Sequence, residues 1–233
     1  MKKFLVIGNP IEHSLSPRLH NHWFKENNID ATYDKKKLSE NDIEGIIAEV
    51  KNGKIDGINV TVPFKRSVIP FLDYLSPTAK KTQSVNTIYK KGDQVIGDNT
   101  DVDGFVASLE YHKIGLRSVR VLILGAGGVV PSIIVALQKM KVSNITISNR
   151  TRKKAEELKI DYPINIKDWP IKNVEDFDLV INATSLGLNP GQEHSQDDLN
   201  KINIKENYGG EKLSYLPIFY DLIYNPSETF LLL

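Results

Sequence analysis

This sequence of 233 residues contains no cysteine, and its net charge is close to zero. Without cysteine the chain cannot form disulfides, thiolate metal sites or a cysteine nucleophile, a composition that fits the cytoplasm. The 30 basic and 29 acidic residues leave a net charge of +1. That balance argues against a nucleic acid or a membrane surface as partner, so we expect a small-molecule ligand. We expect the chain to be a monomer or a homodimer.

Long hydrophobic runs are also missing from the chain. The run after Met1-Lys2-Lys3 is only about five residues long, too short for a signal sequence or a membrane span. The five histidines show no grouping typical of a metal site, since His20 and His22 would face different sides of one helix. We therefore expect neither a membrane anchor nor a bound metal.

The pattern that is present alternates strands and helices. With 233 residues and 40% hydrophobic residues, the chain is long enough to bury a core in each of two domains. In residues 1–102, strands are predicted at 4–8, 32–38 and 55–62, with helices between them. A turn at 90–93 then joins two further short strands into a hairpin. This arrangement predicts an α/β domain with a mixed sheet.

Residues 103–233 repeat the strand–helix alternation without a hairpin. A helix from Asp101 or Asp103 to Tyr111 is predicted to connect the two domains. The expected strands are 121–124, 144–148, 178–183 and 217–223. This order is typical of a doubly wound parallel sheet, the Rossmann fold. Residues 187–216 are polar and irregular and predict no element.

A glycine-rich turn follows the buried strand that ends at Leu124. Gly125 allows a tight turn, and Gly127 and Gly128 lack the Cβ that would hold the backbone away from a pyrophosphate. The apolar helix expected at 129–140 would direct its dipole toward that anion. Strand, turn and helix together favour dinucleotide binding, and the alternative is an ordinary strand-to-helix turn.

The next predicted strand, 144–148, is followed by Asn149-Arg150-Thr151-Arg152. An acidic residue here would accept the ribose hydroxyls of NAD, whereas a guanidinium pairs with the 2′-phosphate of NADP. NADP is therefore favoured. The alternative is a solvated basic helix start, which opposes the helix dipole.

Polar residues also gather where strands of the first domain end. Lys65 follows one strand and Asp101 follows the hairpin, at the sheet edge where α/β proteins bind ligands. A lysine beside a carboxylate can give a proton to a carbonyl oxygen while hydride reaches its carbon. The alternative is that these residues cap and turn loops.

The sequence resembles the shikimate dehydrogenase family through motifs that are spread over nearly the whole chain. The motifs that carry the resemblance are Ser14-Leu15-Ser16-Pro17 with His20-Asn21, Asn59-Val60-Thr61-Val62-Pro63-Phe64-Lys65, Val85-Asn86-Thr87, Gly97-Asp98-Asn99-Thr100-Asp101 with Gly104-Phe105, Gly125-Ala126-Gly127-Gly128, Asn149-Arg150-Thr151, Asn182-Ala183-Thr184 with Gly187, and Asp221-Leu222-Ile223-Tyr224-Asn225-Pro226. The resemblance implies NADPH-dependent reduction of 3-dehydroshikimate to shikimate, on the pathway to chorismate and aromatic amino acids.

The resemblance also implies roles for individual residues. Lys65 and Asp101 match the catalytic pair. Substrate binding is implied for Ser14, Ser16, Thr61, Asn86 and Tyr224. Cofactor binding is implied for Gly125, Ala126, Gly127, Gly128, Val129, Asn149, Arg150, Thr151 and Thr184. No metal ligand is implied.

Two departures from the family pattern leave alternatives open. Val130-Pro131-Ser132 stands where the family has small residues, and the family continues past Leu233 with a segment that returns to the first domain and supplies a substrate-binding glutamine. The first hypothesis is an active NADP-dependent shikimate dehydrogenase. The second is an NADP-binding protein with impaired turnover, and the third is a quinate/shikimate dehydrogenase of broader specificity that accepts NAD.

Overall fold

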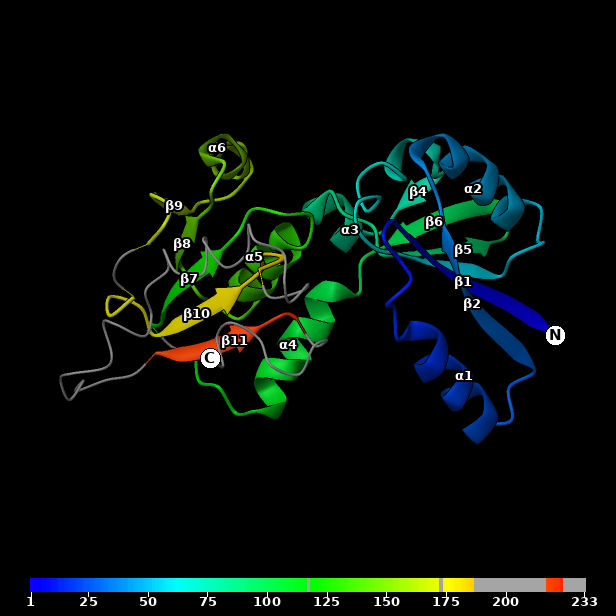
Figure 1. The fold of residues 1–233 in the computed structure, drawn as a ribbon, viewed down its shortest axis with the longest axis horizontal. Coiled ribbons are helices and arrows are strands. Elements are labelled where there is room, and N and C mark those ends of the chain that lie inside the picture. The colour runs from blue at the N-terminus through cyan, green and yellow to red at the C-terminus, as the bar shows by residue number, and fades with distance from the viewer. Residues whose placement is uncertain (117, 172–173, 187–216, 224–233) are drawn as a thin grey trace. The chain divides into compact units, whose positions relative to one another are not determined.

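The computed structural model describes residues 1–116, 118–171, 174–186 and 217–223. These residues belong to two compact units, Met1–Phe105 and Val106–Leu233. Figure 1 shows each unit as a sheet with helices packed on it. The α/β fold class predicted from the sequence is confirmed in both units.

A six-stranded mixed sheet forms the first unit, in the order β2-β1-β3-β5-β6-β4. Its strands are β1 Lys2–Gly8, β2 Ala31–Lys37, β3 Gly57–Val60, β4 Tyr74–Leu75, β5 Thr87–Lys91 and β6 Gln94–Asp98. β1 runs parallel to β2 and β3, while β5 pairs antiparallel with both β3 and β6. The predicted hairpin is therefore the antiparallel part of the sheet.

Helices pack on both faces of this sheet (Figure 1). They are α1 Ser16–Glu26, η1 Glu40–Asp42, α2 Ile43–Lys51, η2 Ile69–Phe71 and α3 Pro77–Thr82, and α4 Asp101–Tyr111 follows the last strand. On the α2 side, four buried helix residues share a core with the strands: Ile43, Ile46, Ile47 and Val50. On the α1 side, a smaller core contains Val6, Ile11 and Tyr33.

The second unit is a five-stranded sheet in the order β11-β10-β7-β8-β9, parallel throughout. Its elements are β7 Arg120–Leu124, α5 Val130–Lys139, β8 Asn144–Ser148, α6 Arg152–Asp161, β9 Asn165–Lys167, β10 Leu179–Asn182 and β11 Ile218–Asp221. The strand order reverses between β7 and β10, the position where doubly wound sheets bind ligands. Among the helices that the structure describes, none has the length and apolar character needed to cross a bilayer.

Candidate functional site

The predicted lysine–aspartate pair is formed in the first unit. Lys65 Nζ lies 2.7 Å from Asp101 Oδ2, and the two side chains are 14% and 26% exposed. Lys65 lies in the turn after β3, which is anchored by buried Phe64 and by the bond from Val85 N to the Lys65 carbonyl. Asp101 is the first residue of α4, where the helix dipole favours a carboxylate. The pair is therefore held from two sides and still reaches solvent.

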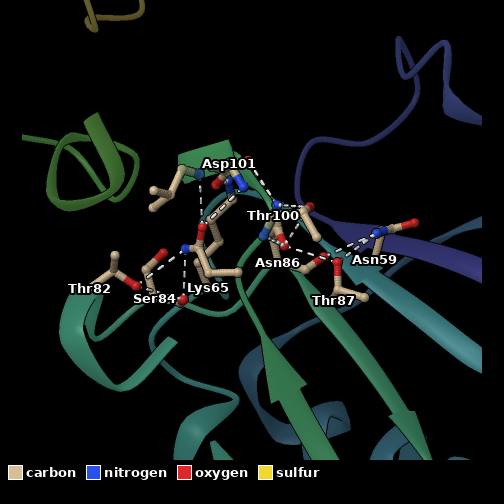
Figure 2. A network of polar contacts seen from close by, with 10 residues as sticks. Asn59, Lys65, Thr82, Ser84, Asn86, Thr87, Thr100 and Asp101 are labelled. Carbon is tan, nitrogen blue, oxygen red and sulfur yellow. Dashed lines mark hydrogen bonds and ion pairs between the residues drawn. The ribbon is translucent and has the colours of Figure 1, made fainter. Parts of the chain in front are cut away.

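Asn86 fixes the other carboxylate oxygen of Asp101 (Figure 2). Its Nδ2 donates to Asp101 Oδ1 at 2.8 Å and to Thr100 Oγ1 at 3.0 Å, and its Oδ1 accepts from Thr100 N at 2.9 Å. The Asn86 side chain is nearly buried. The family resemblance implies a substrate role for Asn86, and the structure shows that its side chain orients the Asp101 carboxylate beside Lys65.

Asn99 orients the start of α4. Its Oδ1 accepts from Asp101 N at 3.0 Å, and its Nδ2 donates to the Ser84 carbonyl at 2.8 Å. Asn99 is 2% exposed, so these bonds are shielded from water. The position of Asp101 therefore depends on a buried residue that the sequence analysis quoted in a motif but gave no role.

Ser14, Ser16 and Thr61 lie beyond the carboxyl ends of the paired strands β1 and β3. Ser16 N donates to Ser14 Oγ at 3.3 Å, and Thr61 N donates to the Ile7 carbonyl at 2.9 Å. A Cβ added at Gly8 would lie 2.5 Å from the Thr61 methyl carbon, so Gly8 makes room for Thr61. Thr61 thus lies at the carboxyl end of the sheet, where α/β proteins bind ligands, and Ser14 and Ser16 lie in the loop after β1 and at the start of α1. Tyr224 lies outside the described residues.

The glycine-rich turn of the second unit has space for an anion. Gly125 has φ +108°, and a Cβ there would lie 2.8 Å from the Ala183 carbonyl oxygen, so glycine is required. A Cβ at Gly127 or Gly128 would meet nothing within 4 Å. Ala126 follows the turn, and Val129 immediately precedes α5. The exposed backbone beside the start of α5 therefore fits a pyrophosphate.

The predicted 2′-phosphate residues follow β8. Asn149 Nδ2 donates to the Thr151 carbonyl at 2.8 Å, which shapes the turn around exposed Arg150. Arg152 Nε instead donates to Glu156 at 2.9 Å, and its guanidinium also pairs with Asp168. These contacts, the hydrogen bond from Glu156 first, raise the pKa of Arg152. Arg152 is thus engaged with two carboxylates, at the start of α6.

Thr184 is fixed by a chain of bonds at the ends of β10 and β11. Thr184 Oγ1 and N donate to Asn182 Oδ1 at 2.7 and 3.0 Å, and Asn182 Nδ2 donates to Asp221 Oδ1 at 3.0 Å. Because Ala183 meets Gly125 at the reversal between β7 and β10, Thr184 lies beside the glycine-rich turn. Sequence reasoning missed the roles of Asn182 and Asp221, although both belong to quoted motifs.

Within the part of the chain that the structure describes, no group of three or more histidine, aspartate or glutamate residues could hold a metal ion.

Comparison with known proteins gives a consistent result across the chain. Residues 6–88 match the family described as "Shikimate dehydrogenase substrate binding domain", and residues 108–192 match "Shikimate / quinate 5-dehydrogenase". The chain is 52% identical over 229 residues to the shikimate dehydrogenase (NADP(+)) of Pelagibacter ubique, covering 98% of this chain and 81% of that relative.

Solved structures agree with the sequence comparison. The crystal structure of shikimate dehydrogenase from Aquifex aeolicus matches with a TM-score of 0.85 and 32% identity, over 100% of this chain and 82% of that one. The Thermus thermophilus shikimate 5-dehydrogenase in complex with NADP(H) and shikimate matches with a TM-score of 0.74 and 30% identity, over 81% of this chain and 70% of that one.

Proposed function

We propose that this chain, which belongs to the shikimate dehydrogenase family, catalyses the reversible NADPH-dependent reduction of 3-dehydroshikimate to shikimate. The observation that carries the proposal is the ion pair between Lys65 Nζ and Asp101 Oδ2, 2.7 Å apart and accessible to solvent. In this proposal residues 1–102 hold the substrate and residues 103–233 hold NADP(H).

Lys65 moves the proton in the proposed reaction. Its ammonium group donates a proton to the carbonyl oxygen of 3-dehydroshikimate as the carbonyl carbon is reduced, which yields the shikimate hydroxyl. In the reverse direction the Lys65 amine takes that proton back. Asp101 keeps Nζ oriented through the 2.7 Å contact. Bound NADPH supplies the hydride for this step.

Ser14 and Ser16 bind the ring carboxylate, and Thr61 and Asn86 bind ring hydroxyls. This assignment rests on the family motif and on the position of these residues at the ends of β1 and β3 and at the start of β5. Tyr224 completes the proposed substrate set through the motif alone.

The cofactor residues are proposed on the fit of the second unit. The backbone of Gly125, Ala126, Gly127, Gly128 and Val129 holds the pyrophosphate, because the turn leaves open space there. The turn after β8, with Asn149, Arg150 and Thr151, binds the 2′-phosphate, and Thr184 lines the cofactor cleft.

The experiment that tests the function is turnover of shikimate with NADP, followed at the absorbance of NADPH, for the native chain and Lys65→Ala. We expect Lys65→Ala to lower kcat by on the order of a hundredfold with little change in KM, because the proton moves only in the transition state. Lys54→Ala, an exposed lysine beyond α2, is the matched control and should keep native kcat. A rise in KM at constant kcat would make Lys65 a binding residue.

A further inference from the structure

Tyr33 is a buried residue of β2 that the proposed reaction does not use. It is 3% exposed, and its hydroxyl donates to Asn59 Oδ1 at 2.7 Å, reaching past β1 to β3. A buried phenol that is hydrogen-bonded to a residue on another strand fixes the distance between the two strands. Tyr33 therefore connects the edge of the sheet to the strand that precedes Lys65.

Helix α1 also holds Tyr33, through Asn21 and His20. Asn21 Nδ2 donates to the Tyr33 carbonyl at 2.7 Å, and Tyr33 N donates to Asn21 Oδ1 at 3.0 Å. The His20 ring stacks on the Tyr33 ring with centroids 4.2 Å apart. Burial raises the pKa of the Tyr33 phenol well above its usual range, and a hydrogen bond with the Ser16 side chain lowers it in part. The phenol is thus a neutral donor, and the contacts of Tyr33 with Asn21 and His20 join this residue to α1.

From Asn59 the bonds continue to the catalytic pair. Asn59 Nδ2 donates to the Asn86 carbonyl at 3.2 Å and to Thr87 Oγ1 at 3.3 Å, and Thr87 Oγ1 donates to Asn86 Oδ1 at 2.9 Å. Asn86 then donates to Asp101, which holds Lys65. Figure 2 shows this path from Asn59 to Lys65. One continuous network therefore joins α1 to Lys65.

We propose that Tyr33 is a positioning residue for the substrate, whose hydroxyl sets the spacing between Ser16 at the start of α1 and the Lys65–Asp101 pair. This inference rests on the proposed function, in which the ring carboxylate binds at Ser16 and the reacting oxygen at Lys65. A rigid ring bound at both ends needs these groups at a fixed separation, because misplacement by a fraction of a bond length weakens both contacts.

The first test is Tyr33→Phe, which removes the hydroxyl and keeps the ring that stacks on His20. We expect KM for shikimate to rise about three- to tenfold, the range for loss of one neutral hydrogen bond, with kcat within about twofold of native. The dissociation constant of NADPH, measured by fluorescence titration, should stay unchanged. Tyr89→Phe, which removes a half-exposed phenolic hydroxyl from β5, is the matched control and should leave KM unchanged.

A double-mutant cycle separates positioning from a structural role. Because Tyr33 acts on substrate through Ser16, the effects of the two substitutions should not be independent. The fold-loss in kcat/KM of the double variant Tyr33→Phe/Ser16→Ala should be at least about threefold smaller than the product of the fold-losses of the two single variants. A merely structural Tyr33 would lower the thermal midpoint and leave KM and the cycle unchanged, which would overturn the inference.

The outcome for the native chain keeps the two proposals distinguishable. Shikimate affinity is measured by calorimetry on the same proteins, so binding is read without turnover. If the native chain neither binds nor oxidises shikimate, the proposed function fails and the role of Tyr33 fails with it. If the native chain does both and Tyr33→Phe matches it in affinity and KM, only the inference about Tyr33 is overturned.

Discussion

Replacing Asn86 by alanine should both destabilise the first unit and slow the reaction. The substitution leaves Thr100 N and Asp101 Oδ1 without the bonds of 2.9 and 2.8 Å that Asn86 makes to them. A buried polar group left unpaired costs about 1–3 kcal/mol. The Asp101 side chain is 26% exposed, so a hydrogen bond from water replaces part of the bond that Asn86 made to its Oδ1. We expect the free energy of unfolding to fall by about 2–4 kcal/mol.

The assay uses the two tryptophans of the chain, Trp23 and Trp169, which lie in different units. In a Trp169→Phe background, Trp23 reports on the first unit alone, and its contact with His20 at 5.4 Å between ring centroids is lost on unfolding. Urea unfolding followed by Trp23 fluorescence then gives the free energy of unfolding for native Asn86 and for Asn86→Ala. At a temperature where the variant stays folded, kcat should fall about tenfold, because Asp101 is oriented less well.

Asn52→Ala is the control, since Asn52 is exposed at the end of α2 and is not one of the residues of the Asp101 network described above. Its free energy of unfolding should stay within about 0.5 kcal/mol of native. The reasoning is refuted if Asn86→Ala loses no more stability than Asn52→Ala, or if kcat is unchanged while the stability falls. The second result would separate Asn86 from the orientation of Asp101.

Two further predictions concern the second unit. Arg150→Asp should weaken NADPH binding by about ten- to a hundredfold and NADH binding far less, because a charge-assisted bond to phosphate contributes about 1.5–3 kcal/mol. Lys159→Asp, with the same charge change on α6, is the control, and equal losses for both cofactors in Arg150→Asp would contradict the role. A hydrogen bond from Arg120 lowers the pKa of the Asp178 carboxyl in the folded chain. The pair therefore stabilises the fold fully at pH values above the unfolded pKa of about 4, and this stabilisation is lost as pH falls through the folded pKa. Asp178→Asn should therefore cost about 1 kcal/mol at pH 7 and progressively less below pH ~4 in urea unfolding, and a loss independent of pH would exclude this pair as its cause.

Local sequence patterns determined most elements of the second unit. The strand predicted at 144–148 is β8 without change, and the strand ending at Leu124 is β7, because buried parallel strands are continuous apolar runs between turn residues. Gly125 has the left-handed backbone that a tight turn demands. Short elements were missed, among them β4 Tyr74–Leu75 and β9 Asn165–Lys167, since two or three residues carry no measurable periodicity.

Only the tertiary structure decided which of these residues meet. Arg152 pairs with Asp168, which lies 16 positions further along the chain, just after β9. Likewise Lys65 and Asp101 are 36 positions apart, and their contact depends on Asn86, Asn99 and the start of α4. Hydrogen bonds of this kind depend on strand register and side-chain direction, which a local pattern does not contain. For the same reason, the sequence around Tyr33 predicts no role for this residue, and only the tertiary structure shows that its hydroxyl bonds to Asn59.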